Sequence, residues 1–386
     1  MATIRKRGNS YQIRVSAGYD ARGNQIVRTK TWKPTSGMTE RQIEKEVQRQ
    51  AIQFEDECLY GLTPEVTKFE ALAQKWLDEH AALNLRKNTV NKYRQVTKRI
   101  YPAFGHLRID KITPMYIQNF INDLAVNGRN LLNGKSLSRK TVLHHLTFIS
   151  DVFNYAVRLG MVRENPCRRV VVPKGDSKEK DIYTVDEVKQ LLTLLENEKF
   201  EYRMFFTLAI FSGFRRGELL GLEWKDVDWE NNIISVRRTA NYTSCDGNFT
   251  DTTKTKKSQR SVRFAPEIME ILREYKSYQE VGRKRVGSKW VDTDRLFTKW
   301  NGECMGMHTP YAWFKKFTAR HGMRFCDIHS LRHFHASLLI ENGVDLTTVS
   351  RELGHSTVTT TANIYCHQLE LAQAKTSSVM SAALLS

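Results

Sequence analysis

The sequence predicts a mainly helical, multidomain protein that also contains small β-sheets. Three observations support this fold class. At 386 residues the chain is too long for one ordinary hydrophobic core, which favours two or three domains. Near the N-terminus, apolar and polar residues alternate as in a strand with one buried face. From residue 68 to about residue 159, apolar residues recur with helical spacing instead.

Residues 1–62 are predicted to form a small sheet followed by a helix. The alternation over residues 10–16 indicates a first strand, and a second is expected at about 25–32, after the turn residues GYDARGN. Thr39 can cap a helix from about 40 to 58, with Gln42 as its capping-box partner.

Three basic side chains are expected on the open face of this sheet: Arg14, Arg28 and Lys30. A two-stranded ribbon fits the DNA major groove, where arginine reads guanine, so these residues are candidate DNA contacts. A solvated sheet face without a ligand is an equally good interpretation.

The next segment, residues 65–165, is expected to be a four-helix DNA-binding module. Proline and glycine divide its helices, and the last one begins after Ser138. Residues 166–180 have the proline and dense charge of an exposed linker. Residues 181–386 are predicted to form a mainly helical domain with a strand pair near 232–238 and 260–264.

The charge of the chain favours a polyanionic partner. Lys and Arg number 60 against 42 Asp and Glu, a formal net charge of +18. The excess is concentrated in residues 65–175, with 19 basic against 8 acidic residues, whereas residues 176–386 hold 30 against 27. Nucleic acid is therefore favoured over a membrane surface, and a merely solvated basic surface is the alternative.

The six cysteines show neither a disulfide framework nor a zinc-finger spacing, and they are interpreted as reduced thiols. No apolar signal core is found at the N-terminus, and no stretch reaches the length of a membrane span. We therefore expect a soluble, cytoplasmic protein without membrane contact.

Candidate catalytic residues lie in the last domain. In SGFRRGELLGLEW, Arg215 follows a tight glycine turn at the start of a helix, where it can face a phosphate. Taken alone, a simple ion pair with Glu218 is the better interpretation. In HSLRH, a helix would present His329, Arg332 and His333 from one face. Arginine between the histidines argues against a metal and for an anion.

Further along, LGHSTVTTTANIY contains His355 and, ten residues later, Tyr365. A tyrosine is more often a packing residue, because a phenol with a pKa near 10 is a poor nucleophile at neutral pH. Nearby positive charge is expected to favour the phenolate and so to activate Tyr365.

These motifs in this order, together with TKTKKSQR, resemble the tyrosine recombinase family, and the whole chain is similar to the integrases of temperate phages and conjugative transposons. The resemblance implies an N-terminal arm-type DNA-binding domain, a helical core-binding domain and a catalytic domain. It assigns the catalytic positions to Arg215, Lys254, His329, Arg332, His355 and the nucleophile Tyr365.

Lys254 has two neighbouring lysines that are alternatives for the same position. Lys256 and Lys257 lie beside it, and Thr253 replaces the proline that is frequent in the family. The alignment to Ser258 and Arg260 favours Lys254. By the same resemblance, His333 is expected to support its helix and Glu218 to orient the arginines.

The implied activity is site-specific recombination: strand cleavage and rejoining through a 3′-phosphotyrosine that integrates and excises a mobile element, without ATP, metal or cofactor. In the implied mechanism, Arg215 and Arg332 hold the phosphate, Lys254 is the general acid, His329 accepts the phenolic proton and His355 donates to the phosphate.

The expected partners are double-stranded DNA at core-type and arm-type sites, three further copies in a homotetramer, and accessory proteins for directionality or DNA bending. Residues 367–386 could form a helix that docks on a neighbouring protomer or packs in cis. The alternatives are a type IB topoisomerase, which relaxes DNA as a monomer, and a noncatalytic DNA-binding regulator.

Overall fold

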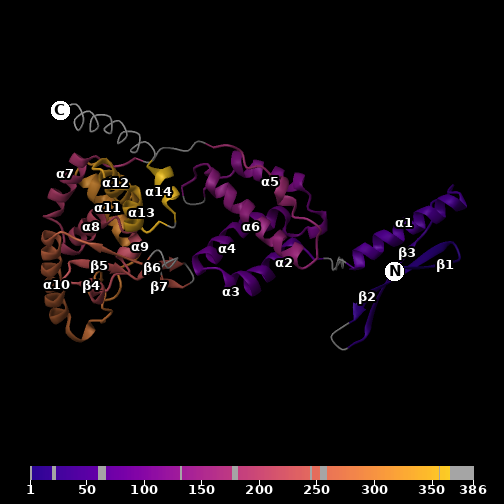
Figure 1. The fold of residues 1–386 in the computed structure, drawn as a ribbon, viewed down its shortest axis with the longest axis horizontal. Coiled ribbons are helices and arrows are strands. Elements are labelled where there is room, and N and C mark those ends of the chain that lie inside the picture. Colours follow the sequence, from indigo (N-terminus) through magenta and orange to yellow (C-terminus); the bar gives the residue numbers. More distant parts are fainter. Residues whose placement is uncertain are drawn as a thin grey trace, which may run out of the picture. The chain divides into compact units, whose positions relative to one another are not determined.

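The computed structural model describes residues 2–19, 23–59, 67–130, 133–175, 181–243, 246–252, 259–355 and 357–365. The chain divides into two compact units, residues 1–177 and 178–386. Helices dominate and the sheets are small and antiparallel, so the predicted fold class is confirmed (Figure 1). Among the described residues, no helix is long and apolar enough to cross a membrane.

The N-terminal part of unit 1 is a three-stranded antiparallel sheet with one helix on it. Strands β1 (Thr3–Arg7), β2 (Ser10–Tyr19) and β3 (Gln25–Trp32) pair in that order, and α1 (Glu40–Leu59) contacts the sheet (Figure 1). The predicted capping box is present, because Gln42 accepts a hydrogen bond from the Thr39 amide at 2.9 Å. Strand β1 was not expected, since its sequence TIRKR lacks apolar alternation.

The register of the sheet corrects the expected placement of two candidate DNA contacts, Arg28 and Lys30. Cross-strand partners share a face, and Lys30 pairs with Ile13 while Arg28 pairs with Val15. Ile13 and Val15 are buried, so Lys30 and Arg28 lie on the face that α1 covers. Lys30 there donates to Gln50 of α1 at 3.2 Å. The expectation that they line the open face was wrong.

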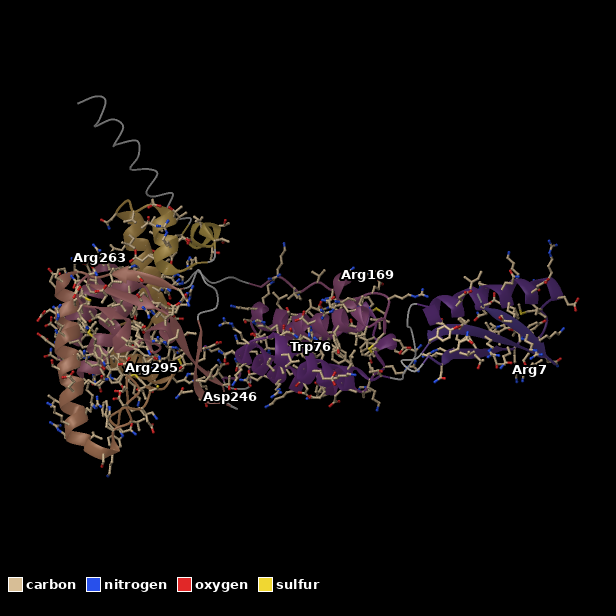
Figure 2. The ribbon with its side chains drawn as sticks, turned by 60° about the horizontal axis from the view of Figure 1, so that its bottom comes forward. Arg7, Trp76, Arg169, Asp246, Arg263 and Arg295 are labelled. Carbon is tan, nitrogen blue, oxygen red and sulfur yellow. The ribbon has the colours of Figure 1, made fainter. Side chains whose placement is uncertain are left out.

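Arg14 does lie on the open face. Its partners are Thr3 and Thr29, and all three point away from the buried pair Ile13 and Val15. The alternation of β1 adds two exposed arginines to this face, Arg5 and Arg7 (Arg7 in Figure 2). The open face therefore keeps a basic character with a different set of residues.

The rest of unit 1 contains four main helical segments in residues 67–130 and 133–175. The segments are α2 (Phe69–Lys75) continued by a π-turn (Trp76–Ala81) and α3 (Ala82–Asn84), α4 (Lys87–Ile100) continued by a π-turn (Tyr101–Gly105), α5 (Pro114–Val126) and α6 (Arg139–Arg158). They enclose one aromatic-rich core that includes Trp76 (Figure 2) and Phe148. Ser138 caps α6 as expected, accepting from the Thr141 amide.

The expected linker over residues 166–180 differs from the structure in its first half. A short 3-10 helix spans Pro166–Arg169 within the expected linker, and another spans Ile109–Lys111, between α4 and α5. Cys167 and Val172 are buried in the helical core. Gln118 fixes the chain further, because its side chain both donates to and accepts from the backbone of Val171 at 2.8 Å. Residues 166–172 thus belong to the helical module, and residues 176–180 lie outside the described residues.

Unit 2 is built around one buried helix. Its helices are α7 (Val185–Leu195), α8 (Phe200–Ser212), α9 (Arg216–Leu219), α10 (Pro266–Val286), α11 (Thr309–Arg320), α12 (Ile328–Glu341), α13 (Leu346–Leu353) and α14 (Val358–Ile364), with 3-10 turns at Trp224–Asp226 and Gly287–Lys289. Every residue from 204 to 210 of α8 is buried, as expected for a helix inside a protein core. It contacts α7, α9, α10 and α12, so it sits at the centre of the core.

Two small sheets complete unit 2. Strands β4 (Val227–Asp228), β5 (Ile233–Val236) and β8 (Arg260–Arg263) form one sheet, and β6 (Arg238–Thr243) pairs with β7 (Gly247–Thr252) in another. The predicted strand pair is confirmed, because β5 and β8 are antiparallel neighbours. The β6–β7 hairpin was not expected. Its anchor is Arg295, whose guanidinium donates to Thr250 at 2.6 Å (Arg295 in Figure 2).

Candidate active site

Arg215 is placed by a sharp reversal of the chain at the end of α8. Gly213 has a φ of +59°, a conformation that favours glycine, and a Cβ there would lie 2.9 Å from the His335 ring. The Ser212 hydroxyl accepts from the Phe214 amide at 3.1 Å and tightens the turn. Arg215 is then the N-cap residue of α9, directly before the helix begins, as the sequence predicted.

Glu218 holds Arg215 in place. One carboxylate oxygen accepts from the Arg215 guanidinium at 2.7 Å, and the other accepts from the Arg215 backbone amide at 2.9 Å. Arg260 of β8 donates to this second oxygen at 2.8 Å. Burial alone would raise the pKa of Glu218, but the charges of Arg260 and Arg215 outweigh it and hold the pKa at about 2. Glu218 is therefore a carboxylate at neutral pH.

Arg332 lies inside the protein on α12. Its side chain is 1% exposed, and its guanidinium donates to the carbonyls of Gly213 and Leu353, each at 2.7 Å. Burial, and then the charge of Arg215, lower its pKa to about 9, which leaves it protonated at neutral pH. It thus ties the turn before Arg215 to the end of α13.

Arg215, Arg260 and Arg332 all donate hydrogen bonds to carbonyls at the end of α13. Its last carbonyls have no partner within the helix and carry the negative end of the helix dipole. Three consecutive ones, those of Glu352, Leu353 and Gly354, accept from Arg260, Arg332 and Arg215 in that order. Gly354 has a φ of +64°, and a Cβ on it would lie 2.9 Å from the Arg260 guanidinium. Both facts explain the glycine of the LGH motif.

His355 follows this turn directly. Its Nδ1 lies 2.7 Å from the hydroxyl of Thr361, a fully buried residue of α14. Burial, and then the charges of Arg332 and Arg215, lower the pKa of His355 to about 4. The ring is therefore neutral at neutral pH, with one N–H to donate.

Tyr365 ends α14 with its side chain inside the protein. It is 1% exposed and packs in a small apolar cluster with Ala336 and Ile340 of α12 and Val349 and Leu353 of α13. Its Oη lies 2.9 Å from Nδ1 of His333. His333 therefore contacts the phenol of the predicted nucleophile, a contact that goes beyond the expected support of its helix.

The acidity of Tyr365 differs from the prediction. Burial raises the pKa of Tyr365 to about 12, and the charge of Arg332 lowers it only in part. Arg332 does lower the pKa of Tyr365, as expected of a nearby positive charge. The expectation that the phenolate would be favoured overall was wrong, because the pKa is raised. Desolvation penalises the charged form more than one neighbouring guanidinium favours it.

Comparison with known proteins identifies the family. The phage integrase family pattern matches residues 182–371, and the phage integrase N-terminal SAM-like domain pattern matches residues 68–125. The chain is 29% identical to a tyrosine recombinase XerC-like protein of Caldanaerobacter subterraneus subsp. tengcongensis, covering 92% of each chain. It is 27% identical to the ICEBs1 integrase of Bacillus subtilis, covering 95% of each. The chain belongs to the phage integrase family, the tyrosine recombinases.

Solved structures share the fold. The Tn1549 transposon integrase in complex with transposon right end DNA has a TM-score of 0.67 at 20% identity, covering 83% of this chain and 100% of that one. A lambda integrase dimer bound to a COC′ core site has a TM-score of 0.55 at 16% identity, covering 94% and 93%. As a tyrosine recombinase, this chain is a site-specific DNA recombinase that cleaves and rejoins strands.

Among the other predicted residues of this recombinase, His329 is exposed at the start of α12. Its ring stands edge-on to that of His333, with 4.8 Å between the ring centres. It also lines a pocket of about 270 Å³ together with Phe214, Arg216, Tyr311, Asp327 and Ile328. The three rings therefore form a row in the order Tyr365, His333, His329, in which His333 and not His329 contacts Tyr365.

Lys254 lies outside the described residues, as do the neighbouring Lys256 and Lys257. The same holds for residues 367–386, so the expected tail contact is not described. Sequence reasoning used Arg260 only to align Lys254, and it did not single out Thr361. The contacts of Arg260 are with residues 42 and 92 positions away, which no local pattern signals. In the described residues, no group of three or more His, Cys, Asp or Glu could hold a metal ion.

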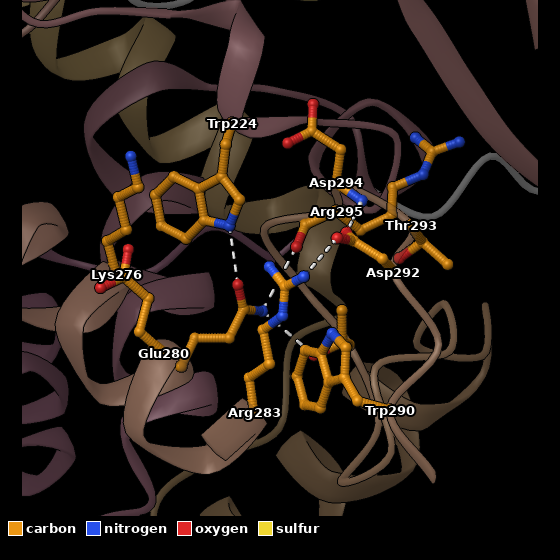
Figure 3. A pocket seen from close by; sticks show the side chains of 11 residues that line it. Trp224, Lys276, Glu280, Arg283, Trp290, Asp292, Thr293, Asp294 and Arg295 are labelled. Atoms are coloured by element: carbon orange, nitrogen blue, oxygen red, sulfur yellow. Dashed lines mark hydrogen bonds and ion pairs between the residues drawn. The ribbon is translucent and has the colours of Figure 1, made fainter. Parts of the chain in front are cut away.

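A second pocket, of about 200 Å³, lies beside α10 (Figure 3). Trp224 donates to Gln279 at 2.7 Å on one wall, and Arg283 pairs with Asp292 at 2.9 Å on another. None of the catalytic candidates described above lines it. These four side chains thus bond in pairs along its walls.

Proposed function

We propose that this recombinase integrates and excises a mobile DNA element, with Tyr365 as the nucleophile. One observation carries the residue assignment: Arg215 and Arg332 bind adjacent carbonyls of one turn, and Tyr365 packs against the same turn through Leu353. The similarity to the ICEBs1 integrase supports a mobile element as the substrate.

The proposed reaction is a transesterification. The Tyr365 oxygen attacks the phosphorus, the bond to the 5′ oxygen breaks, and a 3′-phosphotyrosine forms. Arg215 and Arg332 hold the two nonbridging oxygens and stabilise the developing charge, a function that metal ions serve in other phosphoryl-transfer sites. The phosphodiester is exchanged rather than hydrolysed, so a 5′ hydroxyl from a second duplex can reverse the step without ATP.

The proton of Tyr365 has a partner in place. The phenol donates to Nδ1 of His333 in the proposed mechanism, and His329 lies beyond it at the exposed end of the row. His333 therefore takes the proton-acceptor function that the resemblance gave to His329. Because Tyr365 is 1% exposed, its ring must shift out of the apolar cluster before it attacks, and in the proposed mechanism its oxygen keeps the hydrogen bond to His333 as it shifts. His329 then lies where it can contact the phosphate.

The two remaining residues are His355, which acts on the phosphate, and Lys254, which acts on the leaving 5′ oxygen. In the proposed mechanism, the Thr361 hydroxyl donates to Nδ1 of His355, which leaves the Nε2–H of the neutral ring to donate to a phosphate oxygen. Lys254 protonates the 5′ oxygen, because an alkoxide is a poor leaving group.

The assignment of Lys254 can be tested with a substrate whose 5′ bridging oxygen is replaced by sulfur. A thiol has a pKa of about 8.5, so the departing thiolate needs no proton. Lys254→Ala should cleave normal DNA slowly and the sulfur substrate at nearly the wild-type rate. Lys256→Ala and Lys257→Ala are matched controls, and rescue of either one in place of Lys254→Ala would reassign the acid.

We also propose double-stranded DNA as the partner of three surfaces. The catalytic unit and the basic helical module would bind core-type sites. The open face of the N-terminal sheet, with Arg5, Arg7 and Arg14, would bind arm-type sites. Lambda integrase has been solved as a tetramer on a Holliday junction, which supports a homotetramer here. Accessory proteins for directionality or bending and a cytoplasmic location complete the proposal.

The nucleophile is tested by trapping a covalent adduct. Wild-type protein and Tyr365→Phe are incubated in EDTA with nicked duplexes that carry candidate ends of the element, then denatured. We expect a 3′-linked adduct with the wild type and none with the variant. If the wild type binds these duplexes tightly but forms no adduct, the chain is a DNA-binding regulator and the proposal is wrong.

A further inference from the structure

Arg260 is the arginine of the cluster that has no place in the mechanism above. It begins β8, and its side chain is 4% exposed. Its guanidinium donates to Glu218 at 2.8 Å and to the carbonyl of Glu352, and it lies 5.0 Å from the centre of the Phe214 ring. Such a buried charge is costly unless it is fully paired, and Arg260 is paired with a carboxylate, a carbonyl and a ring.

The partners of Arg260 are the groups that hold the phosphate-binding residues. Glu218 fixes Arg215 through two hydrogen bonds, one to its side chain and one to its backbone. The carbonyl of Glu352 is the first of the three that receive arginines, three residues before His355. Arg260 thus joins the β4–β5–β8 sheet to both sides of the site, and it does so from a position that solvent hardly reaches.

The turn at Gly354 packs closely against the Arg260 side chain. A Cβ on Gly354 would lie 2.9 Å from one terminal nitrogen and 3.2 Å from Cδ of Arg260. The turn before His355 therefore lies directly on the Arg260 side chain. A small displacement of Arg260 would move both the Glu218 carboxylate and this turn, because both contact the same guanidinium.

We propose that Arg260 is a positioning residue of the recombination reaction, which sets Arg215 and His355 against the scissile phosphate without touching DNA itself. This inference rests on the proposed function. Its alternative is a buried ion pair that serves folding alone. The two differ in one respect: a positioning residue affects the rate through the charge on the phosphate, whereas a folding residue does not.

The test measures single-turnover formation of the covalent adduct on nicked duplex at saturating DNA. One substrate is normal, and in the other a methyl group replaces a nonbridging oxygen of the scissile phosphate, which removes its negative charge. Arg260→Met should slow cleavage of the normal substrate about 10- to 100-fold, the effect typical of lost outer positioning groups. The same variant should bind DNA as the wild type does.

On the neutral substrate the ratio of wild-type to variant rate should shrink towards one, because a misplaced Arg215 has no charge left to stabilise. Arg263→Met is the matched control, since Arg263 is an exposed arginine of the same strand (Figure 2). It removes the same charge from β8 and should cleave at the wild-type rate.

Arg260→Lys provides a second variant if Arg260→Met does not fold. Lysine keeps a charge opposite Glu218, but its single ammonium nitrogen lacks the planar, spread donors with which the guanidinium reaches both Glu218 and the Glu352 carbonyl. The same pattern of rates is therefore expected with a smaller effect. A wild-type rate for Arg260→Met, or a defect of equal size on both substrates, would overturn the inference. Absence of an adduct with the wild type would instead contradict the proposed function.

Discussion

The two halves of the active site are prepared to different degrees. Arg215 and Arg332 are fixed by Glu218 and by the carbonyls at the end of α13, so the half that we propose to bind the phosphate, the phosphate-binding half, is ordered without DNA. Tyr365, in contrast, is buried in an apolar cluster, and its pKa is raised to about 12. In the proposed mechanism, the groups that stabilise the transition state are thus fixed in advance, whereas Tyr365 must leave its cluster to act as the nucleophile.

The largest effect is expected in the phosphate-binding half. Arg332→Gln should slow adduct formation about 100- to 1,000-fold, the size seen when one donor to a developing oxyanion is lost. The measurement is single-turnover cleavage at saturating DNA. A mere loss of DNA affinity with a normal rate would show that Arg332 only binds the substrate, and the comparison between the two halves would then fail.

A smaller effect on rate is expected for the proton acceptor of Tyr365. His333→Gln should slow cleavage about 100-fold, within the range of general base catalysis, and make the rate rise more steeply with pH. His335→Gln is the matched control, because His335 is also buried on α12 but bonds to the Ile210 carbonyl. Faster cleavage by His333→Gln would mean that His333 only retains Tyr365 in its buried position.

The carboxylate between the arginines should affect stability. Glu218→Gln leaves Arg215 and Arg260 near each other without a countercharge, and loss of one partner of a buried pair costs roughly 3 kcal/mol in the free energy of unfolding. Urea unfolding of the wild type and the variant would measure this. An unchanged midpoint would show that the arginine half of the site is not held by Glu218.

The smallest effect concerns the pH dependence of stability. The pKa of His355 is about 4 in the folded chain and near 6.5 when unfolded, so the unfolded chain binds a proton first as pH falls. The contribution of His355 to stability is therefore present above pH 6.5 and lost towards pH 4. In urea unfolding, His355→Phe should lose less free energy of unfolding than the wild type between pH 7 and 5. Equal losses would contradict the lowered pKa of His355.

The sequence by itself determined the elements that have a strong local pattern and the positions of most candidate site residues. Alternation placed β2 and β3, helical spacing placed the four-helix module, and HSLRH placed Arg332 and both histidines on α12, because each of these signals is local. Glycine turns likewise located Arg215 and His355, since a positive φ restricts the residue type where it occurs.

Only the tertiary structure decided what depends on distant neighbours. The register with β2 put Arg28 and Lys30 under α1, because a strand's faces follow from its pairing and not from its own sequence. Arg260 gained its partners from residues 42 and 92 positions away. The raised pKa of Tyr365 could not be predicted from its neighbouring charge, which lowers the pKa. It results from the burial of the phenol, and burial is a property of the packed fold.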